Sequence, residues 1–278
     1  MSRLKVRKID DNVYVIREDW RDIDHRFYTK FTNLYLLVGE KKALLLDTSM
    51  GIHSIKELIS PIIKNKELLV FNSHHHFDHV AGNKEFSLIY VHKFDLKLVS
   101  KERDISFLRG IKTKASEYYK KTNYKVLPAK EFYPVEDHEE FDLGKLKITI
   151  IHTPGHTKGS VSLISNKGHL FTADTVHEGA VFLPPKENLP EYLETLEKLQ
   201  KITDTNTYNR EIKLYPGHEK VVLPKTHISL LRKRIQENVM KEDLYNYKYD
   251  TFLEARIIFS EPFIFVVPVN KDESYSIN

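Results

Sequence analysis

The sequence contains no cysteine among its 278 residues. Disulfide bonds, thiolate metal ligands and a cysteine nucleophile are therefore excluded. Any transition metal must be held by histidine, aspartate, glutamate or backbone groups. A long apolar run is missing too, because the longest one late in the chain, 263–267, is far too short to span a bilayer. We therefore predict no membrane-spanning segment.

A strong bias of charge is also lacking. The chain has 43 Lys and Arg residues against 39 Asp and Glu residues, a formal net charge of +4. This small excess is a weak argument for nucleic-acid binding, and a solvated surface explains it better. The segment 1–10 alternates apolar and basic residues and predicts a first strand, not a signal peptide. We expect a cytoplasmic protein with a small-molecule substrate and no membrane or nucleic-acid partner. A homo-oligomer is compatible with the sequence but is not predicted.

The rest of the composition is that of an ordinary globular chain, with 41% hydrophobic and 29% charged residues. No repeat and no low-complexity segment divides it, so we expect a single domain over 1–278. Within this domain, we expect a helical insertion near 93–131 and a divergent C-terminal segment at 226–278. The stretch 112–125 is rich in Tyr and Lys, and a solvated helix face explains it better than a site for an acidic partner.

Hydrophobic patterns predict a mixed fold of strands and helices. An early hairpin over 33–47 leads into a β-α-β passage with its helix at 52–63, although Pro61 makes the last turn of this helix doubtful. The continuous apolar runs of these strands predict that both faces are covered. Further elements are predicted as strands at 13–16, 68–71, 146–151, 161–164, 169–174 and 212–215, helices at 189–202 and 226–241, and a strand-like tail at 255–269.

Histidines and acids cluster directly after the predicted strand at 68–71. In an extended segment, side chains two residues apart point the same way, so His74 and His76 can face one metal while His75 faces away. Asp78 and His79 follow where the chain turns, and this pair can serve a second metal. Imidazole and carboxylate are ligands that zinc accepts when no thiolate is present.

The same residues resemble a known family. His74-x-His76-x-Asp78-His79 matches the metal-binding signature of the metallo-beta-lactamase superfamily, and SHHHFDHVAGN at 73–83 is similar to its glyoxalase II branch. The match continues in the family's order with LLLDT (44–48), HTPGHTKGSVSLI (152–164), LFTADT (170–175) and YPGHE (215–219). The resemblance covers about residues 33–219 and implies an α+β fold, the four-layer αβ/βα metallo-beta-lactamase sandwich.

The resemblance also implies a complete set of metal ligands. The first metal would be held by His74, His76 and His156, the second by Asp78, His79 and His218, and Asp174 would bridge both. Asp47 matches an acid that steadies the histidine loop without binding metal. One departure is Ala173, because the family usually has glycine before the bridging aspartate.

These residues predict a metal-dependent hydrolase. Two cations would share one bridging water and lower its pKa toward about 7, so that hydroxide attacks a carbonyl. Zinc is the preferred metal, with iron or manganese as alternatives. The metals would stabilise the oxyanion, and Asp78 is the predicted catalytic residue because it can take or relay the proton. The expected substrate is a thioester, lactone or similar ester. We find no match to the C-terminal basic residues with which glyoxalase II holds glutathione.

Other functions stay open at this point. An iron oxygenase resembling the persulfide dioxygenases would use positions matching His74, His156 and Asp174. Phosphodiester cleavage ranks lower because no nucleic-acid clamp is recognisable, and a metal-sensing protein without turnover ranks lower because all seven ligand types are present. His177 is predicted either to contact substrate or to pack in a loop. The aromatic residues of 17–31 either line the substrate pocket or anchor a polar loop.

Overall fold

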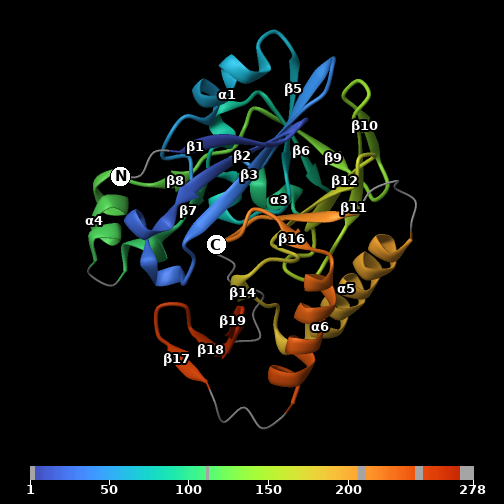
Figure 1. Ribbon diagram of the computed structural model, residues 1–278. Coiled ribbons are helices and arrows are strands. Elements are labelled where there is room, and N and C mark those ends of the chain that lie inside the picture. Colours follow the sequence, from blue (N-terminus) through green and yellow to red (C-terminus); the bar gives the residue numbers. More distant parts are fainter. Residues whose placement is uncertain (1–3, 111–112, 206–210, 242–246, 270–278) are drawn as a thin grey trace.

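The computed structural model describes residues 4–110, 113–205, 211–241 and 247–269. Two sheets pack face to face in the middle, and helices lie on their outer sides (Figure 1). The first sheet has the strand order β1-β2-β3-β4-β5-β6-β9. Its strands are β1 (Lys5–Asp10), β2 (Val13–Asp19), β3 (Phe31–Val38), β4 (Lys42–Leu46), β5 (Glu67–Asn72), β6 (Leu88–His92) and β9 (Glu131–Val135).

The second sheet has the order β10-β11-β12-β13-β15-β16. Its strands are β10 (Glu140–Asp142), β11 (Lys147–His152), β12 (Val161–Ser165), β13 (His169–Ala173), β15 (Lys213–Pro216) and β16 (Leu223–Pro224). The helices are α1 (Ile55–Ile63), α2 (Phe77–Val80), α3 (Leu96–Val99), α4 (Lys114–Lys121), α5 (Leu189–Asp204) and α6 (Thr226–Asn238).

Alternation along the strands explains how the layers form. In β3, Tyr35 and Leu37 join the core between the two sheets, whereas Leu34 and Leu36 join the core under α1. Side chains alternate across a strand, so a continuous apolar run buries both faces. On the outer face of the second sheet, the apolar sides of α5 and α6 form the third core. The predicted α+β four-layer sandwich and its doubly covered strands are thus confirmed.

The pairing confirms the predicted early topology. β3 and β4 are antiparallel, and β4 and β5 are parallel across α1, as the hairpin and the β-α-β passage require. The helix α1 begins after Ser54, whose hydroxyl accepts a hydrogen bond from the Glu57 N–H, and it continues through Pro61 to Ile63. The doubt about its last turn was therefore wrong. In the predicted tail, β18 (Ala255–Ser260) and β19 (Phe263–Pro268) form an antiparallel pair.

A third, smaller sheet joins this tail to the middle of the chain. Its order is β14-β19-β18-β17, with β14 (Gly179–Phe182) parallel to β19 and β17 (Lys248–Asp250) at the edge. Residues 93–131 contain α3, α4 and the two-stranded pair of β7 (Arg103–Asp104) and β8 (Lys125–Val126). Side chains from this stretch, from β14 and from the tail share one apolar core. Residues 111–112, 242–246 and 270–278 of the predicted insertion and C-terminal segment lie outside the described residues.

Candidate metal centre

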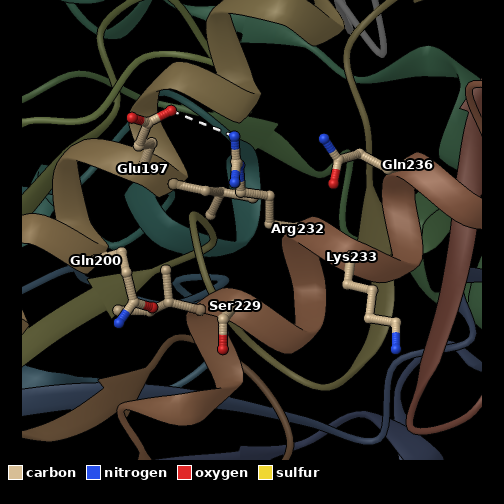
Figure 2. Close-up of a pocket in the computed structure, with 8 residues that line it drawn as sticks. Glu197, Gln200, Ser229, Arg232, Lys233 and Gln236 are labelled. Carbon is tan, nitrogen blue, oxygen red and sulfur yellow. Dashed lines mark hydrogen bonds and ion pairs between the residues drawn. The ribbon is translucent and has the colours of Figure 1, made fainter.

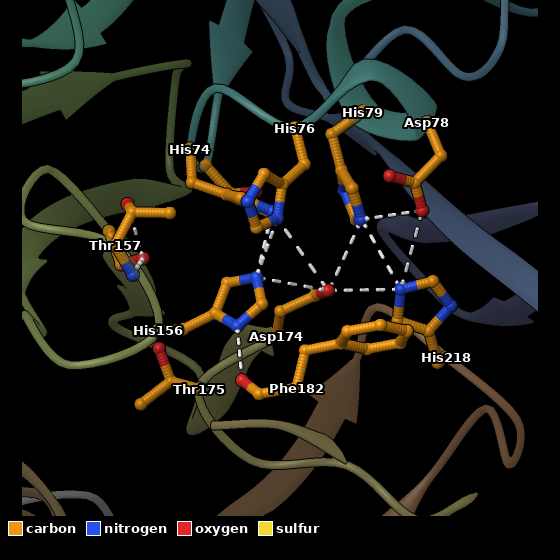
Figure 3. A network of polar contacts seen from close by, with 12 residues as sticks. His74, His76, Asp78, His79, His156, Thr157, Asp174, Thr175, Phe182 and His218 are labelled. Carbon is orange, nitrogen blue, oxygen red and sulfur yellow. Dashed lines mark hydrogen bonds and ion pairs between the residues drawn. The ribbon is translucent and has the colours of Figure 1, made fainter. Parts of the chain in front are cut away.

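The ends of neighbouring strands bring the histidine-bearing loops to one edge of the sandwich. The loop 73–79 follows β5, the loop 153–160 follows β11, Asp174 follows β13, and His218 comes two residues after β15. Loops at strand ends are held by a rigid scaffold and can place side chains accurately. Figure 3 shows the resulting cluster, with all seven side chains converging.

The first group consists of His74, His76 and His156. The Nε2 atom of His156 lies 3.2 Å from Nε2 of His74 and 2.9 Å from Nδ1 of His76. These ring nitrogens point at one another without an acid between them, an arrangement that a shared cation would stabilise. Asp174 Oδ2 lies on the inner side of the group, 3.6 Å from His156 Nε2.

The second group consists of Asp78, His79 and His218. Nε2 of His79 lies 3.4 Å from both Nε2 of His218 and Oδ2 of Asp78. Asp174 reaches this group as well, because its Oδ2 is 3.0 Å from His218 Nε2 and its Oδ1 is 3.2 Å from His79 Nε2. In Figure 3, the Asp174 carboxylate lies between the two groups. The structure therefore brings together all seven residues of the predicted ligand set.

Most of these rings have a partner for the nitrogen that points away from the cluster. Nδ1 of His156 lies 2.9 Å from the Phe182 carbonyl oxygen, and Nδ1 of His218 lies 3.1 Å from the Phe31 carbonyl oxygen. A carbonyl oxygen can only accept, so each Nδ1 donates a proton, and for the neutral His156 this leaves a lone pair on Nε2 that faces the cluster. The tautomer of His156 is thus set for metal binding, and the orientation of His218 is fixed by its contact with the Phe31 carbonyl oxygen.

Asp47 lies behind the histidine loop, in the place that the family resemblance implied. Its Oδ2 is 2.8 Å from His79 Nδ1 and accepts a hydrogen bond from the Ser73 hydroxyl at 2.7 Å, while its Oδ1 accepts from the Ser73 N–H at 2.7 Å. Asp47 is buried, so each of these contacts is made in a medium of low polarity. The carboxylate therefore fixes both the start of the loop and the ring of His79.

Burial and charge act differently on the two groups. In the first, burial is the main cause that lowers the pKa of His74, His76 and His156, so these rings are neutral. In the second, burial also acts to lower the pKa of His79 and His218, but the nearby carboxylates, above all Asp174, outweigh it and raise both pKa values.

The donor set fits divalent cations. Ligand atoms within 4.8 Å of one another come from His74, His76 and His156, from Asp78, His79 and His218, and also from His74, His79 and Asp174. Asp174 Oδ1 is buried, and within the described part of the chain no donor meets it in hydrogen-bond geometry, although His79 Nε2 lies 3.2 Å away. A Cβ atom at Gly217 would lie 2.5 Å from this oxygen, so glycine at this position leaves the carboxylate its space. Nitrogen and oxygen donors of this kind suit zinc, and also manganese or iron.

Ala173 has a backbone conformation that favours glycine. This residue has φ = 43°, in the left-handed region that glycine adopts without strain. The bend directs Asp174 from the end of β13 into the cluster. The glycine that the resemblance implied at this position would adopt this conformation freely, whereas Ala173 adopts it at the cost of strain.

The other histidines near the centre are not in the ligand groups. His75 points away, as its alternation predicted, and its Nδ1 lies 3.0 Å from Asp95 Oδ2. His177 is buried beside His218, with ring centroids 5.1 Å apart, and its Nε2 has no hydrogen-bond partner among the described residues. His152 contacts the Lys158 carbonyl oxygen at 2.8 Å and stacks on His92, so it has a packing role.

Aromatic side chains of the segment 17–31 are anchors of this loop. Trp20 and Phe27 are buried and meet edge to face at 5.3 Å, and Trp20 Nε1 donates a hydrogen bond to Thr32 Oγ1 at 2.7 Å. The hydroxyl of the half-buried Tyr28 donates to Asp250 Oδ2 at 2.7 Å. These contacts favour the interpretation of a packed loop over that of a substrate pocket.

Two buried acids near the centre have no sequence signal. Asp95 belongs to the stretch 93–131, in which no functional residue was predicted. Glu18 lies within the strand β2. Glu18 is fully buried; burial is the main cause that raises its pKa to about 8, with the charge of Asp78 adding to the effect. Because no motif marks either residue, only the fold reveals them.

A separate groove lies between α5 and α6 (Figure 2). It has a volume of about 140 Å³, and its lining includes an ion pair of 3.2 Å between Arg232 Nη2 and Glu197 Oε2. The lining contains none of the seven clustered residues. The groove is therefore distinct from the centre in Figure 3.

Comparison with known proteins identifies the family. The sequence model of one protein family, the metallo-beta-lactamase superfamily, matches residues 28–218, a range that contains all seven clustered residues. The chain belongs to the metallo-beta-lactamase superfamily. It is an enzyme, a hydrolase of this fold, as the motifs predicted.

Relatives of the chain include proteins named as hydrolases. The chain is 23% identical over 230 residues to "Acyl-coenzyme A thioesterase MBLAC2" of Homo sapiens, covering 76% of this chain and 80% of the relative. It is 29% identical over 199 residues to "Probable metallo-hydrolase MJ0888" of Methanocaldococcus jannaschii, covering 70% and 90%. It is 26% identical over 215 residues to mitochondrial hydroxyacylglutathione hydrolase of Saccharomyces cerevisiae, covering 74% and 66%.

Solved structures share the fold. A metallo-beta-lactamase family protein from Thermus thermophilus has a TM-score of 0.61 at 19% identity, covering 83% of this chain and 81% of that chain. At this identity, the likeness concerns the fold alone. Among the described helices, none has the length and apolarity that a membrane crossing requires.

Proposed function

We propose that the chain hydrolyses a thioester, or a related activated ester, at a centre holding two divalent cations, with zinc as the metal. One observation carries the proposal: two groups of three ligand residues lie on either side of the Asp174 carboxylate, which contacts both. Two-metal hydrolytic centres are built from donors of this kind. His74, His76 and His156 would hold one cation, Asp78, His79 and His218 the other, and Asp174 would bridge them.

When bound, the two cations supply Lewis acidity and lower the pKa of a water toward about 7. The residues of the chain prepare this chemistry. The imidazoles of the first group are neutral because burial lowers their pKa. In His156 the proton lies on Nδ1, which donates to the Phe182 carbonyl oxygen, so Nε2 presents a lone pair to the cluster. Asp78 Oδ2, 3.4 Å from His79 Nε2 and 3.5 Å from His218 Nε2, is the atom that we assign to accept and relay a proton.

The substrate class rests on the relatives and on the donor set. An acyl-coenzyme A thioesterase and a hydroxyacylglutathione hydrolase, by their names, both cleave thioesters. Proteins of one fold with one kind of centre can act on different substrates, so the assignment to thioesters comes from these relatives and the motifs that the chain shares with them. A lactone presents the same reacting carbonyl and belongs in the same test. A cytoplasmic location stays a prediction from the sequence.

The experiment measures metal content and turnover on the same preparation. Protein purified without chelators should carry about two zinc ions per chain, and it should hydrolyse a member of a panel of acyl-coenzyme A, glutathione thioester and lactone substrates. One iron per chain with oxygen uptake would replace the proposal with the persulfide dioxygenase-like alternative. Turnover confined to a phosphodiester substrate would replace it with the nuclease alternative.

A further inference from the structure

We propose that Asp95 is a positioning residue that ties together the two loops carrying His74, His76 and His156, and that it acts on this group selectively. The inference rests on the metal centre of the proposed function. It is independent of which ester, if any, the centre cleaves.

Asp95 joins the two loops by direct contacts. It lies immediately before α3 and is 1% exposed. Its Oδ2 accepts a hydrogen bond from the Thr157 hydroxyl at 2.9 Å and lies 3.0 Å from His75 Nδ1, while its Oδ1 accepts from the Gly159 N–H at 3.1 Å. One buried carboxylate therefore holds a residue of the loop 73–79 and two residues of the loop 153–160.

The partners of Asp95 are next to the ligands in the sequence. His75 stands between His74 and His76, and Thr157 directly follows His156. Figure 3 shows Thr157 beside His156 in the loop that carries both. A shift of either partner moves the backbone of an adjacent ligand, so the carboxylate controls the gap across which the three imidazoles meet.

Residues around Asp95 leave space for its carboxylate and hold its partner His75. A Cβ atom at Gly159 would lie 2.5 Å from Cγ of Asp95, so the close approach requires glycine. On the other side, Arg103 Nη2 donates a hydrogen bond to the His75 carbonyl oxygen at 2.6 Å. Burial acts to raise the pKa of Asp95, but His75 and the hydrogen bonds from Thr157 and Gly159 outweigh it, so the group is held as a carboxylate.

Asp47 attaches to a different part of the centre from Asp95. It contacts the ring of His79 directly at 2.8 Å, and it reaches the first group only through Ser73, whose hydroxyl lies 3.0 Å from His74 Nδ1. Within the described part of the chain, the contacts of the Asp95 carboxylate are with His75, Thr157 and Gly159, and none is with the second group. The two buried aspartates thus attach to different parts of the centre.

The test is a metal titration of the full-length, metal-free chain. Zn²⁺ is added in competition with a chromophoric chelator, and Co²⁺ is added separately so that its absorption spectrum reports each binding step. His156→Ala identifies the step that belongs to the first group, and His218→Ala identifies the step of the second. We expect Asp95→Asn to weaken the first-group step by roughly 10- to 100-fold and to leave the second within about twofold.

Two further variants make the result decisive. Thr157→Val removes one of the contacts of Asp95 while keeping the shape of the side chain, and it should weaken the same step by a smaller factor. If Asp95→Asn does not fold by circular dichroism, Thr157→Val alone carries the test. Asp104→Asn, at an exposed acid nearby, should match the wild type in both steps.

Failure of this inference is distinguishable from failure of the proposed function. The inference is overturned if folded Asp95→Asn or Thr157→Val binds both metals as the wild type does, or loses both equally. The proposed function fails if the wild-type chain binds metal but hydrolyses no ester in the panel. In that case, the selective effect of Asp95→Asn on the first-group step would still stand.

Discussion

The two halves of the metal centre lie within one cluster but differ in their electrostatics. The group of His74, His76 and His156 contains only imidazoles, and burial is the main cause that lowers the pKa of each. The group of Asp78, His79 and His218 includes an acid, and carboxylates raise the pKa of both histidines. Without a cation, the second group can balance its charges through ion pairs, whereas the first leaves lone pairs facing one another.

This difference shows that one edge of a sandwich can hold two unlike ligand groups. The shared residue is Asp174, whose pKa is lowered well below its ordinary value because His218 and His79 outweigh the effect of burial. Asp174 therefore belongs to both halves, and its removal should affect them together. Single histidine substitutions should separate them.

The largest effect is expected for Asp174→Ala. This change removes a donor from both groups and leaves His79 and His218 without their main counter-charge. We expect turnover to fall by at least about a thousandfold and both metal-binding steps to weaken. Steady-state kinetics and metal analysis check this, with circular dichroism for the fold and His138→Ala, at an exposed position, as control. Near-normal rates would mean that the centre is assigned wrongly.

Paired substitutions should then separate the halves. His156→Ala and His218→Ala are each expected to lower the metal content from about two ions to one per chain and to reduce turnover by at least about a hundredfold. The retained ion should belong to the other group, which the Co²⁺ spectrum reports. Equal loss of both ions in each variant would contradict two separable groups.

Removal of metal by a chelator should destabilise the fold. A ligand that binds only the folded state stabilises it by about 4 kcal/mol at a thousandfold excess over its dissociation constant. We therefore expect a lower melting temperature after chelation and recovery upon addition of Zn²⁺. The loss should be smaller in His156→Ala, which starts with one group already empty. An identical loss in this variant would indicate that the second group supplies all of the stabilisation.

Glu18 gives a pH prediction for the metal-free chain. Its pKa of about 8 in the folded state exceeds the ordinary 4.5, so the folded chain holds a proton that the unfolded chain releases between these values. Stability from this group is complete below pH 4.5 and is lost as the pH rises to about 8, by up to about 1.4 kcal/mol per pH unit.

Glu18→Gln mimics the protonated acid and should remove this decline. Urea unfolding at several pH values measures the free energy of unfolding of both chains. Below pH 4.5, the two should differ by a constant amount, and above it the variant should gain relative to the wild type. Parallel pH profiles would show that Glu18 is ionised in the folded chain.

The smallest expected effect concerns the bend before Asp174. Ala173→Gly should relieve the strain of φ = 43° and raise the free energy of unfolding by about 0.5–1 kcal/mol, with metal content unchanged. Chemical denaturation measures the change. A loss of stability would mean that the methyl group contributes more through packing than it costs in strain.

The sequence by itself determined much of this protein. Alternating and continuous apolar runs predicted the early hairpin, the β-α-β passage and the mixed fold, because these patterns depend on local periodicity. The cluster of seven residues could be predicted because its members occur in short motifs at strand ends, from His74 to His218. His75 was separated from its neighbours by alternation alone.

Only the tertiary structure decided which distant residues meet. Asp95 is 62 residues from Thr157 in the sequence, and no local pattern relates them. β14 lies beside β19 in a sheet that joins the middle of the chain to its tail. The burial that raises the pKa of Glu18 likewise depends on the packing around it. Motifs in the sequence indicate which side chains can bind metal. The residues that position those side chains, and the burial that shifts a pKa, depend on long-range contacts that form when the layers pack.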